Sequence, residues 1–174
     1  GEVAASERLH IEAEYERFDW RAHAAYNKAD FYDLFGPTKT GRKGYVVGVG
    51  RSQTLIYDEP RRLSLELDAS LSGNLDQLPE FQNIPVDVEH LTEIDARLEY
   101  TNVRRSLGAV DVESGTLWTA VTQASVVESR PVTRVRGTFD RGFALPAGHS
   151  SVWFRQAAGF SPHDPADPFA NFFF

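Results

Sequence analysis

The chain has 174 residues, of which 41% are hydrophobic and 25% are charged, enough for one domain with a sizeable core. Its 18 Lys and Arg against 25 Asp and Glu give a net charge of -7, and no basic stretch is long enough to follow phosphates, which argues against a nucleic-acid partner. No run of about 18 apolar residues occurs, so the sequence excludes a transmembrane helix.

The chain contains neither cysteine nor methionine. Without cysteine it forms no disulfide and has no thiolate chemistry. The opening residues, GEVAASERLH, show no signal peptide. We therefore expect a processed product or a fragment of a longer chain.

Apolar and polar residues alternate along most of the chain, and this period predicts β-strands because successive side chains point to opposite faces of a sheet. The stretch RLSLELDASL (Arg62–Leu71) is the clearest case. Gly, Pro, Asn and Asp between the segments supply turns, and DQLPEFQNI forms a single helical turn at most. The predicted strands, in chain order, are Arg8–Arg17, Phe18–Asn27, Tyr45–Ile56, Arg62–Leu71, Thr92–Asn102, Gly115–Val127, Val132–Phe143 and Ser151–Phe160.

The fold predicted from these segments is all-β: an antiparallel up-and-down meander of about eight strands in one region, residues 1–174. The strands are long for a globular protein, in which they average about 5–6 residues, whereas a strand that crosses a bilayer needs about 9–11. Aromatic residues gather toward the predicted strand ends, like the aromatic girdles of an outer-membrane barrel. The meander is predicted to be all or, by preference, part of a transmembrane β-barrel.

In this interpretation the two sides of each strand meet different surroundings. Charged residues at mid-strand would line a wet lumen, where they form cross-strand ion pairs, because unpaired burial costs several kcal/mol each. The residues predicted to face the lumen are Glu12, Glu14, Arg21, Glu66, Asp68, Glu93, Asp95, Arg97 and Glu99. The residues predicted to face lipid are Leu9, Ile11, Trp20, Leu63, Leu65, Leu67, Ile94 and Leu98.

A second interpretation stays open, because a soluble β-sandwich or barrel also alternates and its charged side chains would form a solvated outer face. Such a domain would bind a ligand or another protein. Dependence of solubility on detergent would separate the two interpretations.

Chemistry finds little support in the sequence. His10, Glu12 and Glu14 share one side of a predicted strand and His23 lies on its hairpin partner, a combination that suits zinc or iron, but an ordinary polar face is the favoured interpretation. GHSS (Gly148–Ser151) lacks a nucleophile elbow, and GVGRS (Gly48–Ser52) has no helix after it. We therefore predict no catalytic residue, no metal site, no cofactor and no enzyme.

Four stretches carry a family resemblance: YNKADFYDLFGPTKTGRKGY (Tyr26–Tyr45), LGAVDVESGTLWTAV (Leu107–Val121), RGTFDRGFALPAGHSSVWFRQAAGF (Arg136–Phe160) and DPFANFFF (Asp167–Phe174). Together they resemble the barrel portion of a bacterial outer-membrane surface-antigen family, similar to the Omp85 superfamily, whose members often carry a TolB-like propeller before the barrel. The resemblance rests on overall texture over nearly the whole chain.

The resemblance implies a bacterial outer-membrane location, with membrane lipid and either the remainder of the polypeptide or partner subunits as partners. In such barrels a segment like PFANFFF leads into a Gly-rich strand, so we expect the closing strands to lie beyond these residues. The superfamily's Arg-Gly-Tyr-type lumen motif is absent from the sequence. Translocation or insertase activity is therefore not implied, and the expected role is a scaffold or pore whose specificity lies in its loops.

Overall fold

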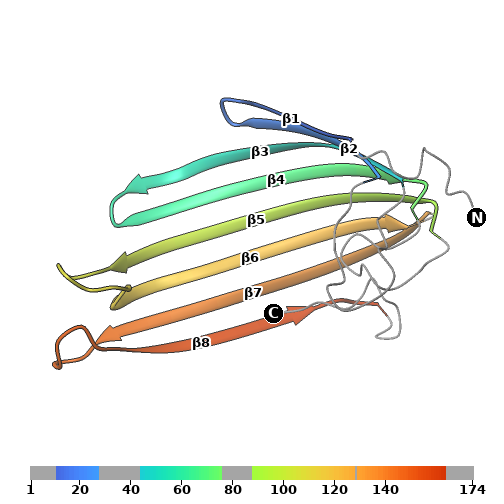
Figure 1. Ribbon diagram of the computed structural model, residues 1–174. Coiled ribbons are helices and arrows are strands. Elements are labelled where there is room, and N and C mark those ends of the chain that lie inside the picture. The colour runs from blue at the N-terminus through green and yellow to red at the C-terminus, as the bar shows by residue number, and fades with distance from the viewer. Residues whose placement is uncertain (1–10, 28–43, 76–87, 128, 164–174) are drawn as a thin grey trace, which may run out of the picture. The chain divides into compact units, whose positions relative to one another are not determined.

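The computed structural model describes residues 11–27, 44–75, 88–127 and 129–163, which form eight strands and no helix (Figure 1). The strands belong to one antiparallel sheet in which each strand pairs with the next along the chain. The predicted all-β meander is thus confirmed. The strands are β1 (Ile11–Arg17), β2 (Trp20–Tyr26), β3 (Tyr45–Asp58), β4 (Arg61–Gly73), β5 (His90–Arg104), β6 (Ser114–Val127), β7 (Arg130–Ala144) and β8 (Ser151–Phe160).

Strand lengths differ from the predicted ten residues in a regular way. β8 covers the predicted segment, whereas β3 to β7 run for 13 to 15 residues. β1 is described from Ile11 and ends at Arg17 as predicted, whereas β2 begins at Trp20, two residues later than predicted, because Phe18 adopts a positive φ of 57° in the turn between them. Positive φ ends the extended backbone that a strand needs.

The connections at the turns also depart from the sequence prediction in one place. β3 and β4 are joined through Glu59–Pro60, and residues 145–150 form a hairpin loop closed by the Leu145 N–H on the Ser150 carbonyl, at 2.9 Å, as predicted. The connection between β5 and β6 covers residues 105–113, and β6 begins at Ser114, one residue before the predicted start at Gly115. DQLPEFQNI, residues 76–84, lies outside the described residues.

Two compact units can be distinguished by their internal contacts. Within the described residues, the first contains residues 11–27, 44–51, 68–75, 88–94, 125–127 and 129–131. The second contains Ser52–Leu67, Asp95–Ala124 and residues 132–163. The single region predicted over residues 1–174 stays a prediction.

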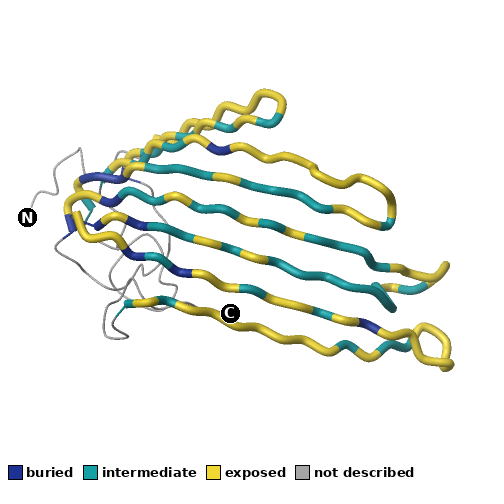
Figure 2. The backbone as a smooth tube through the Cα atoms, turned by 180° about the vertical axis from the view of Figure 1, so that it is seen from behind, coloured by how far each residue is buried: buried dark blue, intermediate teal, exposed yellow. Residues whose placement is uncertain are grey.

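Very few apolar side chains are buried. Among the described residues the buried hydrophobic ones are Val88, Leu91 and Val127 in the first unit and Val132 in the second. By contrast, 24 large hydrophobic side chains of the described residues are exposed. Figure 2 shows the same distribution, with exposed and half-buried backbone along most of each strand. The apolar residues therefore form no ordinary protein core in the described part of the chain.

Candidate functional site

One face of the first three strands is apolar and open. In the register of the sheet Tyr15 lies opposite Ala22, which in turn lies opposite Val49. Trp20 lies on the same face and is 53% exposed. Two further rows across β1, β2 and β3 also consist of aliphatic and aromatic residues: Ala13–Ala24–Val47 and Ile11–Tyr26–Tyr45.

The second unit has an apolar side of its own on β5 to β8. Tyr100 stacks on Trp118 with ring centroids 5.7 Å apart, which places these sides of β5 and β6 together. Phe143 of β7 meets Phe154 of β8 edge to face at 6.1 Å, and 60% of Phe154 is exposed. Large aromatic rings left this open are unusual on a water-facing surface, where extended apolar patches mark binding or membrane contact.

The residues predicted to face lipid lie on the apolar sides of their strands wherever the structure describes them. On β4, Leu63, Leu65 and Leu67 lie on the side opposite to Asp68, as strand alternation requires. On β5, Ile94 and Leu98 share the side of Tyr100, and Ile94 is 56% exposed. Leu9 lies outside the described residues. Contact of this face with lipid stays a prediction.

The opposite face of β1 to β3 is polar and has glycines where large side chains cross it. Glu14 lies opposite His23, and His23 lies opposite Gly48, where a Cβ atom would stand only 2.3 Å from the imidazole Cε1. Arg21 lies opposite Gly50 and forms an ion pair with Asp68 of β4, N to O 3.2 Å. GVGRS therefore has a structural role: its glycines leave room for side chains from β2.

The second unit also carries charged pairs. On β5, Arg97 pairs with Glu99 two residues on, at 2.9 Å. Arg155 of β8 lies opposite Asp140 of β7, with 3.6 Å between the charged atoms. The predicted lumen residues lie on the polar sides of β1, β2, β4 and β5: Glu12, Glu14, Arg21, Glu66, Asp68, Glu93, Asp95, Arg97 and Glu99. Whether this face lines a lumen stays a prediction.

A Ser–His–Glu cluster joins two hairpin loops of the second unit, the β5–β6 loop and the β7–β8 loop. His149 Nδ1 lies 3.1 Å from Glu113 Oε1 and 3.3 Å from Ser106 Oγ, and the Ser106 N–H donates to Glu113 Oε2 at 2.9 Å. Hydrogen bonds from the Ser106 hydroxyl and N–H, followed by His149, hold the pKa of Glu113 below its ordinary value.

This cluster does not have the geometry of a catalytic triad. A triad histidine uses one ring nitrogen for the carboxylate and the other for the nucleophile. Here the serine and the glutamate both approach Nδ1 of His149. The arrangement fastens one loop to the other.

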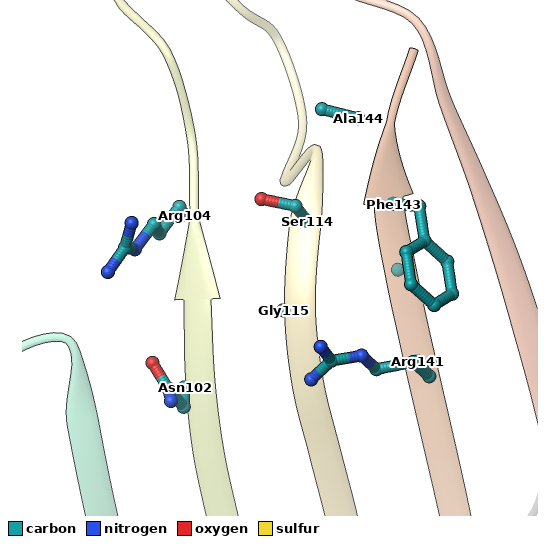
Figure 3. Close-up of a pocket in the computed structure, with 8 residues that line it drawn as sticks. Asn102, Arg104, Ser114, Gly115, Arg141, Phe143 and Ala144 are labelled. Atoms are coloured by element: carbon teal, nitrogen blue, oxygen red, sulfur yellow. The ribbon is translucent and has the colours of Figure 1, made fainter.

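A cavity of about 360 Å³ opens where β5, β6 and β7 approach these loops. Figure 3 shows Arg141 extending from β7 toward β6 at Gly115, with Asn102 and Arg104 on β5 and Ser114 at the start of β6. Arg141 also donates to Thr116 Oγ1 and lies 5.4 Å from the ring centroid of Phe143. This site combines cationic and hydroxyl donors with an aromatic wall.

Sequence reasoning missed this cavity, although one signal for it exists. Phe139, Arg141 and Phe143 share one side of β7, so the arginine interrupts an otherwise apolar series. An arginine among apolar residues lays its stem along the apolar surface and extends its charged end toward water or another polar group. Arg104 carried no such signal, because it is the last residue of β5.

Metal ligation finds no support in the described residues, among which no group of three or more His, Cys, Asp or Glu could hold an ion. Glu14 and His23 lie opposite each other, and His10 lies outside the described residues. His163, which follows β8, accepts a hydrogen bond from the Thr133 N–H at 3.0 Å.

Comparison with known proteins yields no match to a family model, a curated protein or a solved structure. Among the described residues, no helix is both long and apolar enough to cross a membrane. The resemblance to the Omp85 superfamily therefore stays a prediction from the sequence.

Proposed function

We propose that the chain is a membrane-embedded segment of a bacterial outer-membrane β-barrel, a scaffold or pore with its apolar face toward lipid and its charged face toward a wet lumen. The observation that supports this most is the two-sided sheet: 24 large hydrophobic side chains are exposed in the described residues and four hydrophobic ones are buried. In water, each exposed apolar side chain forgoes about 1.5–3 kcal/mol of burial. A lipid environment removes this cost.

Strand length supports the same proposal. A tilted membrane strand needs about 9–11 residues. β3 to β8, with 10 to 15 residues each, reach that length. β2, with 7 residues, is shorter than a full span, and β1 is described only from Ile11. We infer that β3 to β8 cross the hydrocarbon layer.

The alternative of a soluble β-sandwich needs a second sheet against the apolar face. All eight described strands lie in one sheet, so the part of the chain that the structure describes supplies no such layer. A sheet in hydrocarbon must also have no open edge, because unpaired backbone groups there find no water. The proposal therefore assigns partners to β1 and β8 in the rest of the polypeptide or in another subunit.

A depth scan of β4 tests the proposal, and the chain has no native cysteine to interfere. Single cysteines would replace each residue from Leu63 to Asp68 in the full-length protein in native membranes. A lipid-phase quencher and a water-soluble thiol reagent would then be applied to each variant. Two matched controls frame the result: Leu107→Cys in an exposed loop reacts from water in either case, and Ser125→Cys at a buried position is protected in either case.

If positions 63, 65 and 67 are quenched from lipid while 64, 66 and 68 react from water, the barrel proposal holds. If no position is quenched from lipid, the leucines face protein or water. The soluble binding domain is then the better interpretation.

A further inference from the structure

The cavity between β5, β6 and β7 is built for an anion. Its lining residues include Arg104, Arg141, Asn102 and Ser114, and none of the described residues that line it is acidic. Arg141 extends toward β6, whereas the guanidinium of Arg104 points to the far side of β5 (Figure 3). Guanidinium groups bind phosphate oxygens through paired hydrogen bonds. A positive site of this kind is notable in a chain whose net charge is -7.

The nearest carboxylate in sequence is already engaged elsewhere. Glu113, next to Ser114, accepts a hydrogen bond from the Ser106 N–H and contacts His149 through its other oxygen. Only 12% of its side chain is exposed. Glu113 is thus directed into the loop cluster, and the two arginines keep their positive charge for a ligand.

Arg141 is held in place before any ligand arrives. Its hydrogen bond to Thr116 and its position over the Phe143 ring fix two sides of the guanidinium. Arginine has five N–H donors, so several remain for a ligand. A donor already held in its binding geometry loses little freedom on binding, which favours affinity.

The cavity lies at the end of the apolar face. This position favours a lipid over free phosphate, because only a lipid has apolar chains that can contact the face. Phe143 is both a cavity wall and part of the exposed Phe143–Phe154 pair. Phe139, two residues before Arg141, is exposed on the same side of β7. An amphiphile would place its charged group among the arginines and its chains on these rings, whereas inorganic phosphate would use the cavity alone.

We propose that this cavity binds the phosphodiester headgroup of a glycerophospholipid, with the acyl chains lying on the aromatic part of the apolar face; this rests on the proposed membrane location. The volume of about 360 Å³ falls in the range of about 300–1,000 Å³ typical of small-ligand sites. Arg141 binds the phosphate oxygens, Ser114 and Asn102 supply neutral donors, and Arg104 adds positive charge at the rim of the cavity.

Native mass spectrometry of the full chain in a neutral detergent tests the proposal. The probes are dioleoylphosphatidylglycerol, dioleoylglycerol, which has the same chains and no phosphate, and inorganic phosphate. We expect the wild-type protein to retain phosphatidylglycerol, and the double variant Arg104→Gln/Arg141→Gln to retain it at least tenfold more weakly, since each charged hydrogen bond lost costs about a factor of ten.

Two further variants make the result specific. Arg51→Gln is the matched control, because Arg51 also lies over an aromatic ring, Trp20 at 5.4 Å, but is neutralised by Asp19 at 2.7 Å. Its lipid retention should equal that of the wild type. Ser114→Phe fills the cavity while both arginines remain, and it should also lose phosphatidylglycerol, so it decides the question if the double variant does not fold.

Unchanged phosphatidylglycerol retention in the cavity variants overturns the proposal. Equal retention of dioleoylglycerol overturns it as well, since the phosphate would then contribute nothing. Retention of inorganic phosphate without retention of phosphatidylglycerol also overturns it, since the site would then bind a free anion and not a lipid. The cysteine scan of β4 is independent of the cavity. Lipid quenching there together with unchanged retention here would refute the headgroup site and leave the barrel proposal intact.

Discussion

Arg21 of β2 reaches across β3 to Asp68 of β4, and the N to O distance of the pair is 3.2 Å. The strand between them permits this because Gly50 lies opposite Arg21 and has no side chain to block the path. The arginine side chain is 37% exposed and the aspartate side chain 21%. The pair is therefore partly shielded from water and ties together strands that are not neighbours in the sheet.

A double-mutant cycle measures the coupling free energy between Arg21 and Asp68. We expect Arg21→Gln and Asp68→Asn to show a coupling of about 0.2–1 kcal/mol in urea unfolding, near the upper end at low salt and smaller as salt screens the charges. The Arg61–Asp58 pair at the β3–β4 turn is the control, because both of its side chains are more than half exposed. A coupling at Arg21–Asp68 no larger than that of the control would contradict the inference that partial shielding from water strengthens this ion pair.

The space over Gly48 is also testable. In Gly48→Ala the new methyl would stand 2.3 Å from the His23 ring, so the ring must move, at a cost of about 1–3 kcal/mol in unfolding free energy. Adding His23→Ala should recover most of this loss, leaving only the 3.0 Å approach to the Ala69 carbonyl oxygen. Gly148→Ala, where a Cβ meets nothing within 4 Å, serves as the control. Additive losses in the double variant would show that the ring is not the obstacle.

Lysine substitutions on β5 test which side meets lipid. Ile94 is 56% exposed on the apolar side, and Glu93 next to it lies on the charged side. In liposomes we expect Ile94→Lys to lower the folding free energy by up to about 2–4 kcal/mol, the cost of lysine near a bilayer midplane. Glu93→Lys carries the same side chain to the other face and should cost less. Equal and small effects, within about 0.5 kcal/mol, would indicate water on both sides.

The loop cluster predicts a local pH dependence. The pKa of Glu113 is lowered in the fold. The stability that ionised Glu113 contributes is therefore fully present above the ordinary pKa of 4.5, and it is lost as the pH falls through the lowered pKa. We expect hydrogen exchange to find the Ser106 amide protected at pH 5 and unprotected well below pH 4.5. In Glu113→Gln this change should disappear, while the Ser150 amide, bonded to the Ala147 carbonyl, stays unaffected. A persistent change in that variant would assign the effect to another group.

Much of the fold was predictable because strand alternation is a local signal. Ser151–Phe160 coincides with β8, and the predicted segments for β3 to β7 fall within a few residues of the observed ends. The exception is the start of β2, which the Phe18 turn delays to Trp20, because the positive φ of a phenylalanine leaves no mark in an alternating sequence. The assignment of side chains to two faces followed from the same period of two.

The loop cluster and the cavity were not predictable, because each depends on residues far apart in sequence. Glu113 and His149 belong to different hairpin loops, and only the pairing of β6 with β7 and of β7 with β8 brings those loops together. The cavity likewise needs Arg104 and Arg141 from two strands separated by β6. Alternation gives the face of a residue, but not its neighbour on the next strand, which depends on register.

Glycines on the charged face have a consequence for how this sequence can vary. Gly48 lies opposite His23, and Gly142 lies opposite Trp153, whose indole would stand 2.5 Å from a Cβ there. In each pair the large side chain of one strand occupies the space left open by the glycine of the other. Relatives of this chain should therefore show size exchange between partners: a bulky residue at position 48 should accompany a small one at position 23, and the same compensation should link positions 142 and 153.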